Sequence, residues 1–111
     1  MVKILVELIN MDFKKLKIEV CKNAKKYGEK YDIDIDEEFV MLKLFEEMGE
    51  FSEALLTYKN KSRPDKQLPK KESEEELAKE LADVVGMAMV VAEVYDVDLE
   101  EAIKKKWLDK R

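Results

Sequence analysis

The sequence lacks histidine altogether, and it has only one cysteine, three glycines and two prolines among 111 residues. Without histidine, the chain has no imidazole for acid–base catalysis or for binding zinc. Cys21 has no second thiol for an internal disulfide, so we expect it to pack within a helix. Any metal ion that the chain holds must therefore be bound by oxygen atoms.

The shortage of glycine and proline, which interrupt regular structure, favours long helices. Hydrophobic residues make up 46% and charged residues 42% of the chain, a balance that suits amphipathic helices. The length predicts a single domain over residues 1–111. The predicted fold class is all-α, an antiparallel four-helix bundle. Residues 1–10 stay open between a short strand, a helical turn and an arm that packs on a partner.

The chain also lacks an excess of positive charge and a long apolar run. Its net charge is −5, whereas a surface that follows nucleic-acid phosphates usually carries clustered positive charge. No stretch approaches the roughly 20 apolar residues of a membrane span, and the first ten residues are too short and too acidic for a signal peptide. We therefore expect a cytoplasmic protein that binds neither nucleic acid nor membrane.

Apolar residues recur at helical spacing along the first half of the chain. Asp12 is the predicted N-cap of a helix over residues 13–31, which we expect to fray near Gly28. Asp34 or Asp36 is the predicted cap of the next helix. The apolar seam of that helix repeats in steps of three and four residues: Met41, Leu44, Met48, Phe51, Leu55 and Tyr58.

Residues 59–73 are predicted to form a loop, because they are polar, rich in lysine and interrupted by both prolines. Ser73 and Glu76 have the form of a capping box that would start the third helix, and Asp98 with Glu101 has the same form before the last helix. The basic side chains of the loop could close over phosphates, although a charged loop is more often simply solvated.

The second half of the third helix, residues 84–95, is apolar nearly all the way round. A chain of this length offers too few other elements to cover such a helix. We therefore expect self-association, as a homodimer or a homotetramer, with this helix packed against a second subunit.

Two acidic pairs occupy the same register on the second and third helices. Glu47 and Glu50 each precede a core residue, as Glu80 and Asp83 do. If the two helices pack seam to seam, the pairs lie on matching flanks and four carboxylates converge. A hard cation, Mg²⁺ with Mn²⁺ as an acceptable substitute, would offset their repulsion. The competing interpretation is that both pairs are solvent-exposed surface residues that bind no ligand, as acidic pairs three residues apart often are.

The acidic segments resemble a known family. "EEMGE" at residues 46–50 and "ELAD" at residues 80–83 are similar to the Glu-Glu-x-x-Glu and Glu-x-x-Asp signature of the all-α nucleoside triphosphate pyrophosphohydrolases, the MazG-like group. The similarity extends over roughly residues 39–107. It implies hydrolysis of a nucleoside triphosphate to a monophosphate and pyrophosphate, in the service of nucleotide-pool cleaning.

The resemblance also implies roles for individual residues. Glu46 would bind a further metal ion or orient the attacking water, beside the catalytic Glu47 and Glu50. Lys106 matches a lysine that contacts phosphate in the family, and Trp107 beside it is our first candidate for contact with the base. Four carboxylates would hold Mg²⁺: Glu47, Glu50, Glu80 and Asp83.

Two other functions stay open at this point. Phosphoribosyl-ATP pyrophosphohydrolases of histidine synthesis resemble the same fold and acidic pattern. A helical oligomerisation module that binds divalent ions without catalysis would need the acidic residues but no substrate site.

Overall fold

The computed structural model describes residues 11–109, and within that range every regular element is helical. The prediction of an all-α fold is confirmed for this part of the chain, whereas residues 1–10 lie outside it. The elements are α2 (Phe13–Tyr31), α3 (Glu37–Tyr58), a 3₁₀ turn η1 (Pro64–Lys66), α4 (Lys70–Val94), α5 (Leu99–Ile103) and a π-helical turn η2 (Lys104–Leu108).

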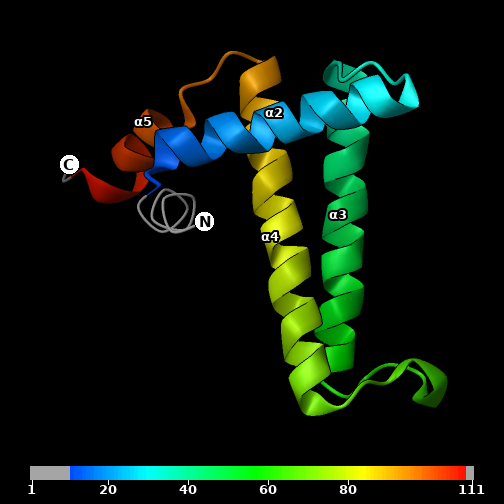
Figure 1. Cartoon of the computed structure of the whole chain (residues 1–111). Helices are drawn as coiled ribbons and strands as arrows, with labels where there is room; N and C mark the ends of the chain where they lie inside the picture. Colours follow the sequence, from blue (N-terminus) through cyan, green and yellow to red (C-terminus); the bar gives the residue numbers. More distant parts are fainter. Residues whose placement is uncertain (1–10, 110–111) are drawn as a thin grey trace, which may run out of the picture.

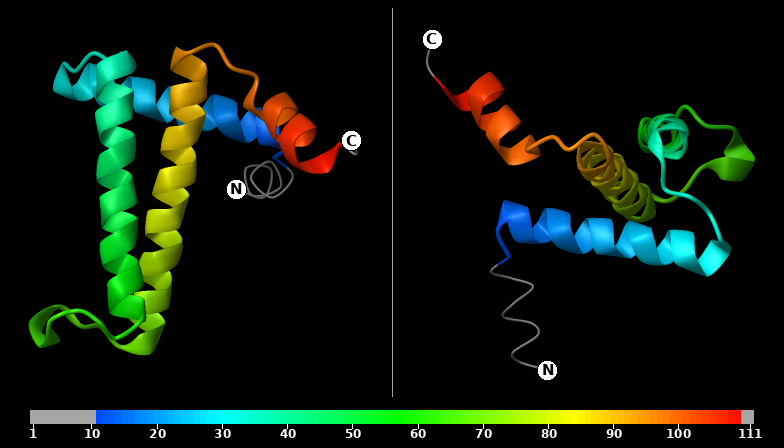
Figure 2. Two further views of the ribbon diagram at one scale, coloured as in Figure 1. Left: turned by 180° about the vertical axis from the view of Figure 1, so that it is seen from behind. Right: turned by 90° about the horizontal axis from the view of Figure 1, so that it is seen from above.

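The two longest helices, α3 and α4, form an antiparallel hairpin, and α2 runs across one end of it (Figures 1 and 2). Short α5 lies beside the start of α2, where Lys17 Nζ donates a hydrogen bond of 3.1 Å to the carbonyl of Val97. The antiparallel arrangement is thus found for α3 and α4. The predicted antiparallel bundle of all four helices is not confirmed.

Three of the predicted caps are present at the helix starts. Asp12 accepts a hydrogen bond of 2.8 Å from the backbone N–H of Lys15, and Asp36 accepts one of 2.9 Å from Phe39. Asp98 accepts one of 3.1 Å from the backbone N–H of Glu101. Each carboxylate satisfies an N–H that has no partner inside its helix.

The predicted capping box at Ser73 is wrong. Helix α4 begins at Lys70, because Pro69 holds the extended conformation before the first turn and its carbonyl accepts the first helical bond, from Ser73 N–H, at 2.9 Å. Ser73 lies inside the helix, buried, with its hydroxyl donating to the carbonyl of Lys70. The predicted loop therefore ends at residue 69.

Gly28 also differs from the prediction, because the helix continues past it to Tyr31. The chain leaves the helix through Asp32, in the left-handed conformation, and folds back so that the N–H of Ile33 bonds to the carbonyl of Gly28. A Cβ at Gly28 would lie 2.7 Å from the carbonyl oxygen of Ile33 and 2.8 Å from Ile35 Cγ1. Glycine is needed here for this close approach of the chain.

The buried apolar core of the described residues is small. Many large apolar side chains of the same helices are exposed, among them Met48 at 50% and Leu55 at 37%. The predicted seam of α3 is therefore not the face that α4 covers most completely. No helix within residues 11–109 has the length and apolar character needed to cross a membrane. The core residues are Val40, Ala54, Met89, Val90 and Ala92.

Candidate metal centre

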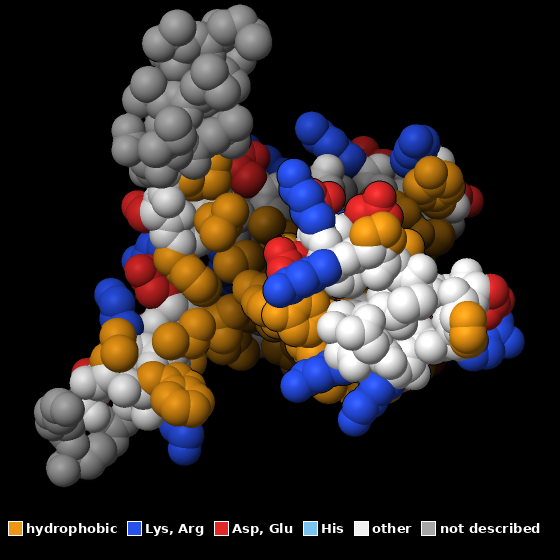
Figure 3. Space-filling model, turned by 90° about the horizontal axis from the view of Figure 1, so that it is seen from below, with side chains coloured by type: hydrophobic (Ala, Val, Ile, Leu, Met, Phe, Trp, Pro, Cys, Tyr) orange, Lys and Arg blue, Asp and Glu red, His pale blue; other side chains and the backbone are white. Residues whose placement is uncertain are grey.

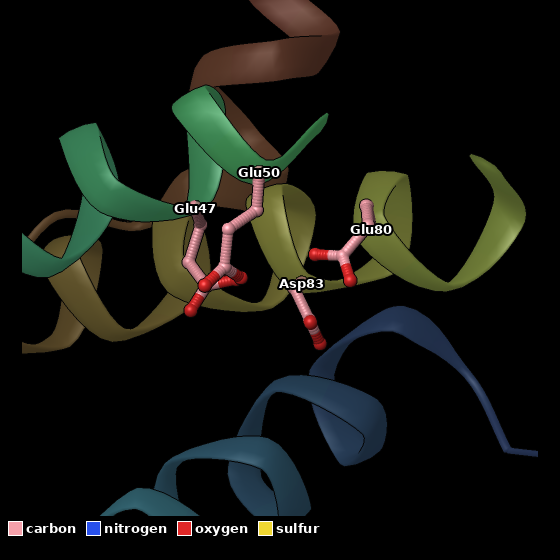
Figure 4. Close-up of side chains that lie close together, drawn as sticks. All are labelled: Glu47, Glu50, Glu80 and Asp83. Atoms are coloured by element: carbon pink, nitrogen blue, oxygen red, sulfur yellow. The ribbon is translucent and has the colours of Figure 1, made fainter. Parts of the chain in front are cut away.

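Four acidic side chains meet between α3 and α4, as Figure 4 shows. Residues three apart lie on one side of a helix, and the antiparallel hairpin turns the two pairs toward each other. One carboxylate oxygen from each residue lies within 4.8 Å of the others. The sequence predicted this convergence with all four members: Glu47, Glu50, Glu80 and Asp83.

The contact surface differs from the one predicted. Glu80 is 8% exposed and Glu47 is half-buried, on the same side of α3 as the buried residues Val40 and Ala54. The buried side of α3 is therefore displaced from the predicted seam toward the acidic flank: Leu44 and Phe51 of the seam are half-buried, whereas Met48 and Leu55 are exposed. Glu50 and Asp83 remain exposed at the edges of the contact.

Two oxygen atoms of the cluster are buried without a hydrogen-bond partner, Glu47 Oε2 and Glu80 Oε2. An unsatisfied buried carboxylate oxygen destabilises a fold, and most buried polar atoms in proteins are paired. A cation between the carboxylates would satisfy both atoms at once. Because every donor is a carboxylate oxygen, the site fits a hard divalent ion such as Mg²⁺ or Mn²⁺.

The electrostatics of the cluster point the same way. Burial, followed by the negative charges of Glu50 and Asp83, raises the pKa of Glu47 to about 7. Burial and the same two neighbours raise the pKa of Glu80. Without a cation, Glu47 is therefore partly protonated near neutral pH, and a divalent ion would compete with that proton for the same oxygens.

Glu46 does not join the other four carboxylates. Its Oε1 accepts a hydrogen bond from Lys43 Nζ, and its side chain is 53% exposed. This bond is the main cause that raises the pKa of Lys43. A role for Glu46 with a further metal ion or a water molecule stays a prediction.

Lys106 and Trp107 lie in η2, near the C-terminal end of the described chain. Trp107 is 78% exposed. The four carboxylates have a cleft on each side of them, and neither Lys106 nor Trp107 lines either of these clefts. Their predicted contacts with phosphate and base also stay predictions.

A cleft of about 540 Å³ opens between α2 and the hairpin, and we call it the α2-side cleft. Glu47 and Asp83 border it, and its walls are otherwise mostly apolar. Two aromatic residues, Tyr27 and Phe39, stand there with their ring centroids 6.5 Å apart. Sequence reasoning had no means of placing these two rings beside the acids.

A second cleft, of about 900 Å³, lies on the other side of the cluster, between the hairpin and the loop of residues 59–69. We call it the loop-side cleft and these residues the connecting loop. Glu50, Glu80 and Asp83 border the cleft, so Asp83 is shared with the α2-side cleft. Four basic residues line it: Lys61, Arg63, Lys66 and Lys79. Sequence reasoning did not assign Lys79 to a substrate site, although its position directly before Glu80 was a usable signal.

Comparison with known proteins gives one family and one relative. The family described as MazG nucleotide pyrophosphohydrolase domain matches residues 35–110. A Bacillus subtilis (strain 168) protein, named Uncharacterized protein YvdC, is 38% identical over 63 residues. That alignment covers 55% of this chain and 59% of the relative, so the chain spans less than two thirds of the relative's length. No solved structure matches the chain.

Proposed function

This chain belongs to the family of MazG nucleotide pyrophosphohydrolase domains, and on that premise we propose that it hydrolyses nucleoside triphosphates between the α and β phosphates with Mg²⁺. The observation that carries the proposal is the convergence of Glu47, Glu50, Glu80 and Asp83, two of which hold buried oxygens without partners. Such a cluster is unfavourable in the free chain and becomes favourable around a divalent ion.

When bound, Mg²⁺ would neutralise phosphate charge and make a water molecule a better nucleophile. All four carboxylates would hold the ion, Glu47 and Glu80 from the buried side. The second oxygens of the exposed Glu50 and Asp83, which border the clefts, would accept hydrogen bonds from the attacking water. The water oxygen bonds to the α phosphorus, and the bond to the αβ-bridging oxygen breaks. Its electron pair leaves with pyrophosphate, and the proton of the water passes through a carboxylate to solvent.

The α2-side cleft is our proposed position for the nucleoside. Its apolar wall and the rings of Tyr27 and Phe39 suit the face of a base. Asp83 lies at the edge of the cleft and belongs to the cluster, so a nucleoside bound in the cleft would lie next to the cluster. This assignment leaves the identity of the base and the sugar open.

We also propose that a second copy of the chain covers the outer face of the hairpin. On α3, Leu42 is 62% and Phe45 is 61% exposed, and on α4, Leu81 is 48% and Val85 is 49% exposed. Packing against a second hairpin would remove such surface from water and complete a bundle of four helices.

The reaction is tested by measuring pyrophosphate release from a panel of canonical and damaged nucleoside triphosphates and from phosphoribosyl-ATP, with Mg²⁺. We expect release by the parent chain and loss of release by Glu50→Gln, which removes one charge from the cluster at constant size. Glu38→Gln, an exposed change in the first turn of α3, is the matched control.

The outcome of this panel separates the candidate functions. Release from canonical or damaged triphosphates supports nucleotide-pool cleaning, whereas release from phosphoribosyl-ATP alone would assign the chain to histidine synthesis. No release from any compound would favour a metal-binding module. Unchanged release by Glu50→Gln would remove that residue from the mechanism.

A further inference from the structure

The connecting loop places positive charge opposite the acidic cluster. Lys61, Arg63 and Lys66 of the loop line the loop-side cleft together with Lys79 of α4. Arg63 is paired with Asp65 and Lys79 with Glu76. Within the described part of the chain, Lys61 and Lys66 make no ion pair, so their charges are available to a ligand.

Hydrogen bonds hold this loop in one conformation against the end of α3. The N–H of Lys61 donates to the carbonyl of Leu56 at 2.8 Å, and the hydroxyls of Thr57 and Ser62 lie 2.6 Å apart. Gln67 Nε2 donates to the carbonyl of Thr57 at 2.6 Å and to Asn60 Oδ1 at 3.0 Å. The backbone that carries the lysines is therefore organised before any ligand arrives, which lowers the entropic cost of binding.

The net negative charge of the metal site explains why a polyphosphate would need these lysines. Four ionised carboxylates around one divalent ion leave an excess of two negative charges, and this excess would repel a polyphosphate. The α2-side cleft has one lining lysine, Lys43, and that residue is paired with Glu46. The loop-side cleft has four basic residues against Glu53 and Glu76 as its acidic residues outside the cluster. Figure 3 shows lysine and arginine side chains around the loop.

Resting on the proposed function, we infer that the connecting loop is a phosphate-binding element, in which Lys61 and Lys66 bind the β and γ phosphates of the substrate. The substrate then spans the acidic cluster, with its base in the α2-side cleft and its terminal phosphates in the loop-side cleft. Pyrophosphate, the leaving group, departs from the side that the lysines line. This inference also predicts a preference for nucleotides that carry two phosphates beyond the scissile bond.

The test is a calorimetric titration of inorganic pyrophosphate, with Mg²⁺ in excess, into the parent chain and into Lys61→Gln/Lys66→Gln. We expect the variant to bind pyrophosphate about 10-fold or more weakly, because two charge-assisted hydrogen bonds are lost. Lys59→Gln/Lys71→Gln is the matched control, since it removes the same charge from the first residue of the connecting loop and from the first turn of α4, outside the cleft. A titration of Mg²⁺ alone should give equal affinity for all three proteins.

Equal weakening in both double variants would show a general effect of net charge and overturn the inference. Unchanged binding in Lys61→Gln/Lys66→Gln would overturn it as well, as would a loss of Mg²⁺ binding in that variant. The titration does not require turnover. Failure of the parent to release pyrophosphate from any triphosphate therefore counts against the proposed function, while the titration alone decides whether the loop binds phosphates.

Discussion

The inner and outer faces of the α3–α4 hairpin reverse the usual distribution of side chains. Between the helices lie Glu47 and Glu80, with buried carboxylate oxygens that have no partner. On the outside lie large apolar residues such as Leu42 and Phe45, more than half exposed. Both arrangements are unfavourable for an isolated chain in water. The difference teaches that the buried and the exposed surface cannot be explained by the same partner: we propose a cation for the inner face and a second hairpin for the outer face.

The largest expected effect comes from making the inner face apolar with Glu80→Met. We expect pyrophosphate release to fall by more than the roughly 100-fold typical for loss of a residue that supports a metal ligand, since a ligand itself is removed. The same variant should unfold at a higher temperature than the parent in EDTA, because a buried, unsatisfied carboxylate is gone.

Activity assays and thermal unfolding in EDTA measure the two effects. Glu74→Met, at an exposed position of α4, serves as the control. It should change neither the activity nor the unfolding temperature in EDTA by much. A Glu80→Met protein that is as active as the parent, or that unfolds at a lower temperature without metal, would contradict our account of the inner face.

The outer face is tested with Phe45→Glu, which replaces one of the exposed apolar side chains of the hairpin with a charge. Light scattering at micromolar concentration should report a dimer or tetramer for the parent and a mass near the 13.0 kDa of one chain for the variant. Glu38→Lys is a control that changes charge at the start of the same helix. A parent chain that is monomeric would refute the proposed association.

A smaller effect is expected from pH in the absence of metal. The pKa of Glu47 is about 7 in the folded chain and 4.5 in a model peptide, so the folded state binds the proton more tightly than the unfolded state. The free energy of unfolding in EDTA should therefore decrease as pH rises from about 4.5 to about 7, because the folded state must then accept an unfavourable charge.

Urea unfolding at several pH values measures this dependence. Excess Mg²⁺ should reverse it, since Mg²⁺ binds the deprotonated carboxylates, and Glu47→Gln should reduce it. The free energy of unfolding could instead change with pH equally in the metal-free parent and in Glu47→Gln. That result would show that Glu47 does not titrate as we describe.

Much of this structure follows from local patterns in the sequence. The caps at Asp12, Asp36 and Asp98 are confirmed, because a cap involves residues only three positions apart. The convergence of the acidic pairs is also found, since two helices joined by a reversing loop must run antiparallel. A prediction from a local pattern of this kind holds in the folded chain when no distant contact competes with it.

The errors and omissions involve contacts between distant parts of the chain. Gly28 is explained by the return of Ile33 and Ile35 onto the helix, which spacing along one helix cannot show. The seam of α3 was predicted to face α4, but spacing along one helix could not show that Met48 and Leu55 stay exposed in the folded chain. The two clefts depend on the path of the connecting loop and on the crossing of α2.

The central claim is tested most directly by anomalous scattering from crystals of the full chain grown with Mn²⁺. Our account predicts a strong peak between α3 and α4, within bonding distance of Glu47, Glu50, Glu80 and Asp83. Well-ordered crystals without a peak there, or with the ion bound only at other residues, would contradict it.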